Sequence, residues 1–166
     1  MAMTLLDVRP FAQGDDPAVA GAIVQQAYFA LPGYPRDAEY DAMLGDVATR
    51  STEAEVLVAV LDGRMVGCLT YVADHHSPHA EFADADAASF RYFGVAPGVQ
   101  SRGVGEAMVN WCIARARLDG LLRIRIHTLE SMPGAQRLYT RMGFVRDPEH
   151  DEEWDGIVGL AFVYHL

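Results

Sequence analysis

The stretch that decides the fold is Val95-Ala96-Pro97-Gly98-Val99-Gln100-Ser101-Arg102-Gly103-Val104-Gly105. It begins at the end of an apolar, strand-like segment, Ser89 to Val95. After Gly103 the apolar side chains recur at the spacing of a helix face, at Val104, Ala107, Met108 and Trp111. A strand, a glycine-bearing loop and a helix in this order form an anion-binding geometry. Glycines let the backbone approach a phosphate, and the free N–H groups of the first helical turn point toward it.

Other phosphate-binding loops fit this stretch less well. A dinucleotide-binding fingerprint needs a third glycine where Met108 stands, and here the motif follows a long N-terminal half. A P-loop needs Gly-Lys-Ser or Gly-Lys-Thr, and the chain contains neither. On this motif alone, a purely structural tight turn stays open.

The segment that follows the predicted helix has the alternation of a strand. Apolar residues at Leu122, Ile124 and Ile126 alternate with polar ones at Arg123, Arg125 and His127. Gly120 supplies a left-handed end to the helix just before it. Strand, helix and strand in this order form a βαβ unit, so we expect the two strands to be parallel.

The N-terminal half predicts a strand, two helices and a hairpin. Asp62-Gly63 between Val56–Val60 and Met65–Tyr71 is the signal for an antiparallel hairpin with a tight turn. The other elements are expected at Thr4–Val8 (strand), Pro17–Tyr28 (helix, with Asp16 as N-cap) and Asp37–Val47 (helix). The aromatic loop 28–35 either lines a pocket or covers the edge of the core.

Composition limits the partners. The net charge of −10 disfavours a nucleic-acid partner, because such proteins usually cluster Lys and Arg. No apolar run reaches the roughly 18 residues that a membrane span needs, so we expect a cytoplasmic protein with no membrane partner. Cys68 and Cys112 have no metal-ligand spacing and are expected to be buried, reduced thiols. With 166 residues and no linker or repeat, the chain is expected to form a single domain over 1–166.

Two motifs together resemble one family. The run 95–105 looks like the acyl-CoA loop of the GNAT superfamily of N-acetyltransferases, with the pattern Gln/Arg-x-x-Gly-x-Gly/Ala. Downstream, Ala135-Gln136-Arg137-Leu138-Tyr139-Thr140-Arg141-Met142-Gly143-Phe144 is similar to that family's Ala-x-x-Leu-Tyr-x-x-x-Gly-Phe signature. The resemblance implies an α/β fold with a mixed, mostly antiparallel sheet of about seven strands and helices on both faces.

The resemblance also implies acetyl-CoA as cosubstrate and assigns roles to residues. Backbone groups beside the pantetheine arm would come from Phe93, Gly94 and Val95. The pyrophosphate loop would be formed by Gln100, Ser101, Arg102, Gly103, Val104, Gly105 and Glu106. Tyr139 would protonate the departing thiolate, although a core aromatic is the alternative interpretation. No metal is implied.

Two positions depart from the family pattern. Met132 stands where relatives often have an Asn that binds pantetheine, and Ser89 stands where many carry a Glu that serves as base. The general base is therefore unassigned. Candidates lie in the segment 74–86, rich in His, Asp and Glu, which is also interpretable as a solvated loop or, less readily, a metal site. The acidic run 147–155 is interpretable as a solvated turn or as a trap for a cationic substrate.

The predicted function is acetyl transfer to a small-molecule or peptide amine, directly, through a tetrahedral intermediate. The resemblance also implies a possible homodimer. The alternative is a non-catalytic acyl-CoA-binding or sensor module of the same fold, which the departures at Met132 and Ser89 permit.

Overall fold

A computed structural model describes residues 4–166 of the chain. Their contacts group into two units, one formed by residues 4–71 and 92–111 and the other by residues 72–91 and 112–166. The division passes through strand β4 (Ala87–Val95) and through helix α4 (Val104–Leu118). In the described residues no helix combines the length and the apolar character that a membrane span requires.

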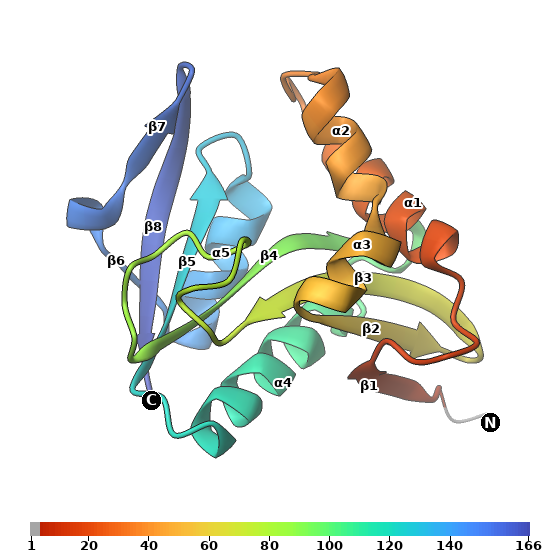
Figure 1. The fold of residues 1–166 in the computed structure, drawn as a ribbon. Helices are drawn as coiled ribbons and strands as arrows, with labels where there is room; N and C mark the ends of the chain where they lie inside the picture. The colour runs from red at the N-terminus through yellow and green to blue at the C-terminus, as the bar shows by residue number, and fades with distance from the viewer. Residues whose placement is uncertain (1–3) are drawn as a thin grey trace. The chain divides into compact units, whose positions relative to one another are not determined.

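The first unit begins with an antiparallel β-sheet and three helices (Figure 1). Its elements are β1 (Leu6–Pro10), α1 (Pro17–Phe29), α2 (Ala38–Gly45), α3 (Val47–Glu53), β2 (Glu55–Leu61) and β3 (Arg64–Val72). Strand β2 pairs with both β1 and β3. Asp62 and Gly63 both have positive φ angles, +50° and +83°, as a tight hairpin turn requires. The predicted hairpin is confirmed.

The helices of the first unit differ from expectation in one place. Asp16 caps α1 as predicted, because its carboxylate accepts a hydrogen bond from the Ala18 N–H at 2.9 Å. The expected helix at 37–47 is wrong in its extent, since α2 ends at Gly45 and a separate helix, α3, begins at Val47. Asp46 leaves the helical conformation with ψ of 65° and caps α3 by accepting from the Thr49 N–H. A second capping residue within the run therefore divides the helix.

A buried arginine holds the end of α2. Arg50 donates hydrogen bonds to the carbonyls of Met43 and Leu44 and to the Thr70 hydroxyl, and its guanidinium lies 4.5 Å from the centre of the Tyr92 ring. Burial lowers the pKa of Arg50, but the helix-end carbonyls and the aromatic face favour its charged form. The surrounding core cluster consists of Ala20, Val24, Leu44, Val47, Val56, Cys68 and Tyr92.

The second unit contains the parallel strand pair. Besides the start of β4 it holds β5 (Arg123–Leu129), α5 (Pro133–Met142), β6 (Val145–Arg146), β7 (Glu152–Trp154) and β8 (Ile157–His165). The strand order is β4-β5-β8-β6, with β7 also paired to β8. Strands β4 and β5 are parallel, with Ala87 opposite Arg123, whereas β8 runs antiparallel to β5, β6 and β7. The expected mixed, mostly antiparallel sheet is confirmed.

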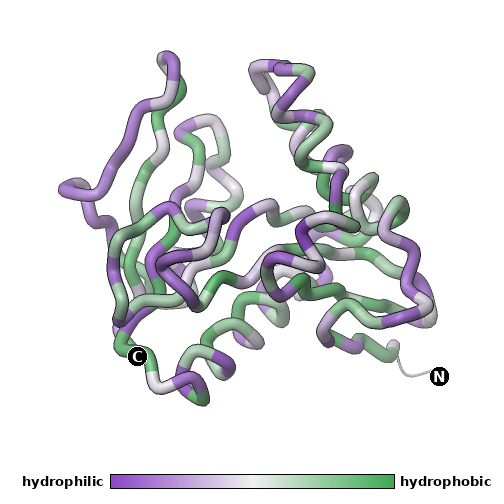
Figure 2. The backbone as a smooth tube through the Cα atoms, viewed as in Figure 1, coloured by the Kyte–Doolittle hydropathy of each residue, from purple (hydrophilic) through white to green (hydrophobic). Residues whose placement is uncertain are grey.

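The run 147–155 is more ordered than a solvated turn. It forms a 3-10 turn at Pro148–His150 and then β7, and Figure 2 shows it as mostly hydrophilic beside the mostly hydrophobic β8. Helix α5 begins with Pro133 and ends at Gly143 in the left-handed conformation, both as predicted.

The sheet of the second unit has two different faces. Ile124, Ile126 and Thr128 of β5 are buried on one face, and Arg123, Arg125 and His127 lie on the other. On this second face, charged side chains of β5 bond to residues of the segments 81–84 and 147–150. We call it the charged face.

Candidate functional site

The loop before α4 has the backbone conformation of an anion site. Gly103 and Ser101 have φ angles of +80° and +70°, and α4 begins at Val104. Ala107 is the first residue of this helix whose N–H donates to a carbonyl one turn back, that of Gly103, at 3.0 Å. The amides of the first turn, before Ala107, precede the first such bond and are the N–H groups that a helix start presents to a ligand. Gly103 adopts this left-handed conformation at little cost because it has no Cβ, and it directs the chain into the helix.

The side chains of this loop leave the helix start accessible. The Gln100 side chain turns back toward the strand, with Nε2 3.5 Å from the Val95 carbonyl oxygen. Arg102 donates its backbone N–H to the Val99 carbonyl at 3.3 Å, and its exposed side chain forms no hydrogen bond or ion pair within residues 4–166. Glu106 lies in the first turn of α4. An exposed guanidinium next to a helix N-terminus favours a phosphate-bearing ligand.

The end of β4 is irregular where the resemblance places the pantetheine arm. Tyr92 has φ of +51°, a left-handed conformation that costs a non-glycine residue on the order of 1–3 kcal/mol. Gly94 lies against α1, since a Cβ there would stand 2.9 Å from both the Ile23 carbonyl oxygen and the Val24 Cα. Glycine at 94 is therefore required by packing. The irregularity at Tyr92 changes the direction of the backbone groups of Phe93 and Val95 from those of a regular strand.

Tyr139 lies on α5 in the second unit, with its ring among aromatic side chains. Ring centres of Phe90, Phe144 and Phe162 lie 5.9, 5.6 and 6.2 Å away, and the residue is only 5% exposed. Burial raises the pKa of the Tyr139 phenol, with a smaller contribution from Cys112 in the same direction. The phenol is therefore protonated at neutral pH, the state that a proton donor needs.

Met132 and Ser89 occupy the two positions that depart from the family pattern. The Thr128 hydroxyl approaches the Met132 sulfur at 3.7 Å, and Met132 immediately precedes α5. The Ser89 hydroxyl is buried and makes no hydrogen bond. Neither side chain supplies the amide or carboxylate that the family pattern has there. In the described residues no group of His, Cys, Asp and Glu is arranged to hold a metal ion.

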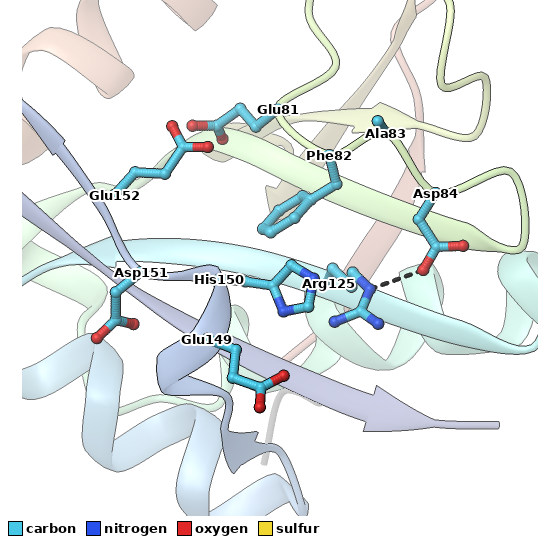
Figure 3. A pocket seen from close by; sticks show the side chains of 9 residues that line it. All are labelled: Glu81, Phe82, Ala83, Asp84, Arg125, Glu149, His150, Asp151 and Glu152. Carbon is cyan, nitrogen blue, oxygen red and sulfur yellow. Dashed lines mark hydrogen bonds and ion pairs between the residues drawn. The ribbon is translucent and has the colours of Figure 1, made fainter.

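A pocket of the second unit opens on the charged face (Figure 3). Its volume is about 260 Å³. It is lined by Glu81, Phe82, Ala83, Asp84, Arg125, Glu149, His150, Asp151 and Glu152. Segments 81–84 and 149–152, far apart in the chain, meet here.

Ion pairs fix the floor of this pocket. Arg125 donates to Asp84 at 2.7 Å and to Asp147 at 2.6 Å, and Asp84 also accepts from Arg123. Burial opposes ionisation of Asp84, yet the two guanidinium groups outweigh it and lower the pKa of that carboxyl. Similarly, the hydrogen bonds from Arg146 lower the pKa of Asp151 to about 2.

His127 joins the two segments that cover the charged face. Its Nε2 lies 2.8 Å from the His150 carbonyl oxygen, and its Nδ1 lies 3.4 Å from Glu81 Oε2. The Phe82 ring stacks on the imidazole with 4.3 Å between ring centres. Burial lowers the pKa of His127, but the carboxylate and the carbonyl outweigh it and the net shift is upward. Nδ1 completes no hydrogen bond, but the Glu81 carboxylate beside it and the His150 carbonyl both favour the imidazolium over the neutral ring.

The structure brings the predicted cofactor residues together as two neighbouring segments of the first unit. They are Phe93 to Val95 at the end of β4 and Gln100 to Glu106 at the start of α4. Arg125 and His127 were not predicted to be pocket or site residues, whereas Glu152 lies in the run 147–155, for which a trap for a cationic substrate was one interpretation. The available signal was the alternation of Arg123, Arg125 and His127 on one strand face, which indicates a face covered by opposite charge.

Comparisons with known proteins agree on one fold. A sequence model described as the acetyltransferase (GNAT) family matches residues 22–144. The GCN5-related N-acetyltransferase from Kribbella flavida is 26% identical, with a TM-score of 0.69 over 97% of this chain and 98% of that one. A GNAT family acetyltransferase from Elizabethkingia anophelis, determined with acetyl-CoA bound, is 18% identical, with a TM-score of 0.67 over 97% and 98%.

A third solved structure, a GNAT family acetyltransferase from Staphylococcus aureus Mu50, is 11% identical. Its TM-score is 0.70 over 98% of this chain and 99% of that one. A search of curated proteins finds no match.

Proposed function

Because the chain belongs to the acetyltransferase (GNAT) family, we propose that it transfers the acetyl group of acetyl-CoA to an amine acceptor. The observation that carries the proposal is the start of α4. The N–H groups of a helix start, a left-handed Gly103 and the exposed Arg102 side chain follow one another there and suit a pyrophosphate. The acetyl-CoA bound to the Elizabethkingia anophelis relative supports the choice of cosubstrate.

The reaction needs an attacking amine, a stabilised oxyanion and a protonated leaving group. When bound, acetyl-CoA supplies the activated acyl carbon as a thioester. The neutral acceptor nitrogen forms a bond to that carbon and releases one proton to solvent, the carbon–sulfur bond breaks, and the thiolate takes a proton from a donor that solvent then reprotonates. We assign the proton to the buried phenol of Tyr139, and the stabilisation of the oxyanion to backbone N–H groups near Val95.

The family match crosses both contact units, which supports one catalytic domain over 1–166 rather than two separate ones. A cytoplasmic location and a homodimer belong to the same proposal. Gel filtration combined with light scattering tests the dimer, and a monomer at working concentration would remove it.

A second candidate function is favoured by Ser89 and Met132. Neither supplies the group that the family pattern places there, so a module that binds acyl-CoA without turnover is the alternative. It predicts cofactor binding with no thiol release for any amine.

Calorimetric titration with acetyl-CoA, followed by a thiol-release assay with a panel of amines, tests the proposal. Gly103→Val should weaken acetyl-CoA binding about tenfold, because a β-branched residue resists the left-handed conformation by roughly 1–2 kcal/mol. The matched control is Gly14→Val, which changes another glycine with positive φ in open surroundings. Equal affinity in both variants, or no binding by the folded wild-type protein, would contradict the assigned loop.

A further inference from the structure

Ser89 carries a buried hydroxyl without a hydrogen-bond partner. The residue is 8% exposed, and its Oγ is one of two buried side-chain polar atoms in residues 4–166 that lack such a partner. Ala88 pairs with Ile124 on the apolar face of the sheet, so alternation along β4 places Ser89 on the charged face. A buried hydroxyl that bonds to nothing is destabilising, which makes an alanine the better residue unless something bonds to it.

The hydroxyl lines a small cavity that offers acceptors. This inner cavity, of about 10 Å³, is lined by Ser89 together with Val72, Asp74, His75, Ala80, Glu81, Phe82, Ala87 and Ala88. A space of this size holds a group about as large as one water molecule. Glu81 keeps acceptor capacity because its contacts to Arg91 Nε and His127 Nδ1 are long, 3.6 and 3.4 Å. An ammonium group, with three donors and no acceptor, matches a hydroxyl beside a carboxylate.

Glu81 and Phe82 also line the 260 Å³ pocket, so the inner cavity and this outer pocket share a wall. Negative charge is in excess in the outer pocket. Its only arginine, Arg125, is matched by Asp84 and Asp147, and Asp151 is matched by Arg146. Glu152 accepts only from the Trp154 indole, and Glu149 has no hydrogen-bond or ion-pair partner within residues 4–166. Figure 3 shows the Glu81 and Glu152 side chains directed toward the same end of the pocket.

The excess negative charge repels an anion and attracts a cation to Glu149 and Glu152. We propose that the two cavities together bind a small aliphatic amine of positive charge. Its ammonium group contacts Ser89 and Glu81, and its body lies beside Phe82 toward Glu149 and Glu152. Identifying this amine as the acetyl acceptor rests on the proposed function, whereas its binding does not.

Calorimetric titration with 1,4-diaminobutane at low ionic strength tests the inference, with 1,4-butanediol as the uncharged probe of the same length. The wild-type chain should bind the diamine and not the diol. Ser89→Ala should weaken binding about tenfold, as expected for the loss of a hydrogen bond to a charged group. Glu152→Gln should weaken it by a smaller factor, about threefold, because that carboxylate is exposed.

Glu153→Gln is the matched control, since Glu153 is the next residue on β7 and does not line the pocket. It should leave diamine affinity unchanged. Ser89→Ala should also raise the melting temperature without ligand, because it removes an unsatisfied polar group.

Three results would overturn the inference. They are equal affinity for diamine and diol, equal diamine affinity in wild type and Ser89→Ala, and no diamine binding by a folded chain that binds acetyl-CoA. The last result would leave the proposed function in place. Failure to bind acetyl-CoA with intact diamine binding would contradict the proposed function alone.

Discussion

The β4-β5-β8 sheet in the second unit has one face covered by apolar side chains and one covered by ion pairs. On one face Ile124 and Ile126 are fully buried, and Tyr139 packs among phenylalanine rings. On the charged face, one residue along the same strand, Arg125 and His127 contact carboxylates and a backbone carbonyl. The apolar face gains stability from packing. The charged face gains specific ion pairs at the cost of removing charges from water.

This contrast predicts that the apolar face carries more of the stability and that its contribution is insensitive to salt. Ile126→Ala should lower the free energy of unfolding by about 3 kcal/mol, through lost burial and a residual cavity. Urea unfolding at low and at high salt measures it. Leu122→Ala, at a residue 56% exposed, is the control and should change stability by less than about 0.5 kcal/mol. A loss below about 1 kcal/mol for Ile126→Ala would mean that the apolar face is not the main source of stability.

Tyr139→Phe separates chemistry from packing on the apolar face. The ring stays and the hydroxyl is lost, so kcat should fall about 100-fold while acetyl-CoA affinity and stability stay nearly unchanged. Thiol-release kinetics and calorimetry measure the two. Tyr164→Phe, another tyrosine that packs on Phe144, is the matched control and should keep wild-type kcat. An unchanged kcat in Tyr139→Phe would show that Tyr139 is a core aromatic and not the proton donor.

Asp84→Asn tests the charged face. It leaves Arg123 and Arg125 without their shared carboxylate, and should cost about 2 kcal/mol of unfolding free energy at neutral pH. The pKa of Asp84 is lowered in the folded chain, so this contribution is present above the unfolded value near 3.9 and is lost as pH falls through the folded value. Chemical unfolding at pH 7 and at lower pH should show the gap closing in acid.

The matched control for Asp84 is Asp7→Asn, whose carboxylate makes a 3.7 Å ion pair with Arg9 at an exposed position. It should change stability by less than about 0.5 kcal/mol. If the two variants cost the same, the ion pairs of the charged face are worth no more than surface pairs.

His127→Gln should have the smallest effect, about 1 kcal/mol, and an opposite pH dependence. The imidazole faces Glu81, the His150 carbonyl, Phe82, Trp154 and, through its charge, Glu152. Its pKa is raised in the folded chain, so the stabilisation is complete below the unfolded value near 6.5 and is lost as pH rises through the folded value.

Unfolding curves of wild type and His127→Gln, measured from about pH 5.5 to about pH 9, should therefore converge as the pH rises. His165→Gln, at an exposed histidine of β8, is the control and should change the free energy of unfolding at neutral pH by less than about 0.5 kcal/mol. A gap that widens with pH would indicate that His127 is neutral in the folded chain.

The sequence by itself determined the elements whose signals are local. Asp16-Pro17 and Asp62-Gly63 predict a helix start and a hairpin because each needs a particular backbone geometry that few residues adopt. The loop at Gly103 and the helix end at Gly143 were predictable for the same reason. The second cap at Asp46 was missed, since nothing in one sequence distinguishes an acidic residue within a helix from one that divides it.

Only the tertiary structure decided what covers the charged face. The alternation of Arg123, Arg125 and His127 indicates a polar strand face, but not whether water or protein lies against it. Asp84 and Asp147 reach Arg125 from segments 41 and 22 residues away, and their ion pairs with it depend on how the chain returns to the sheet. A local backbone conformation depends on neighbouring residues, whereas a charge pair between distant segments forms only when the chain has folded.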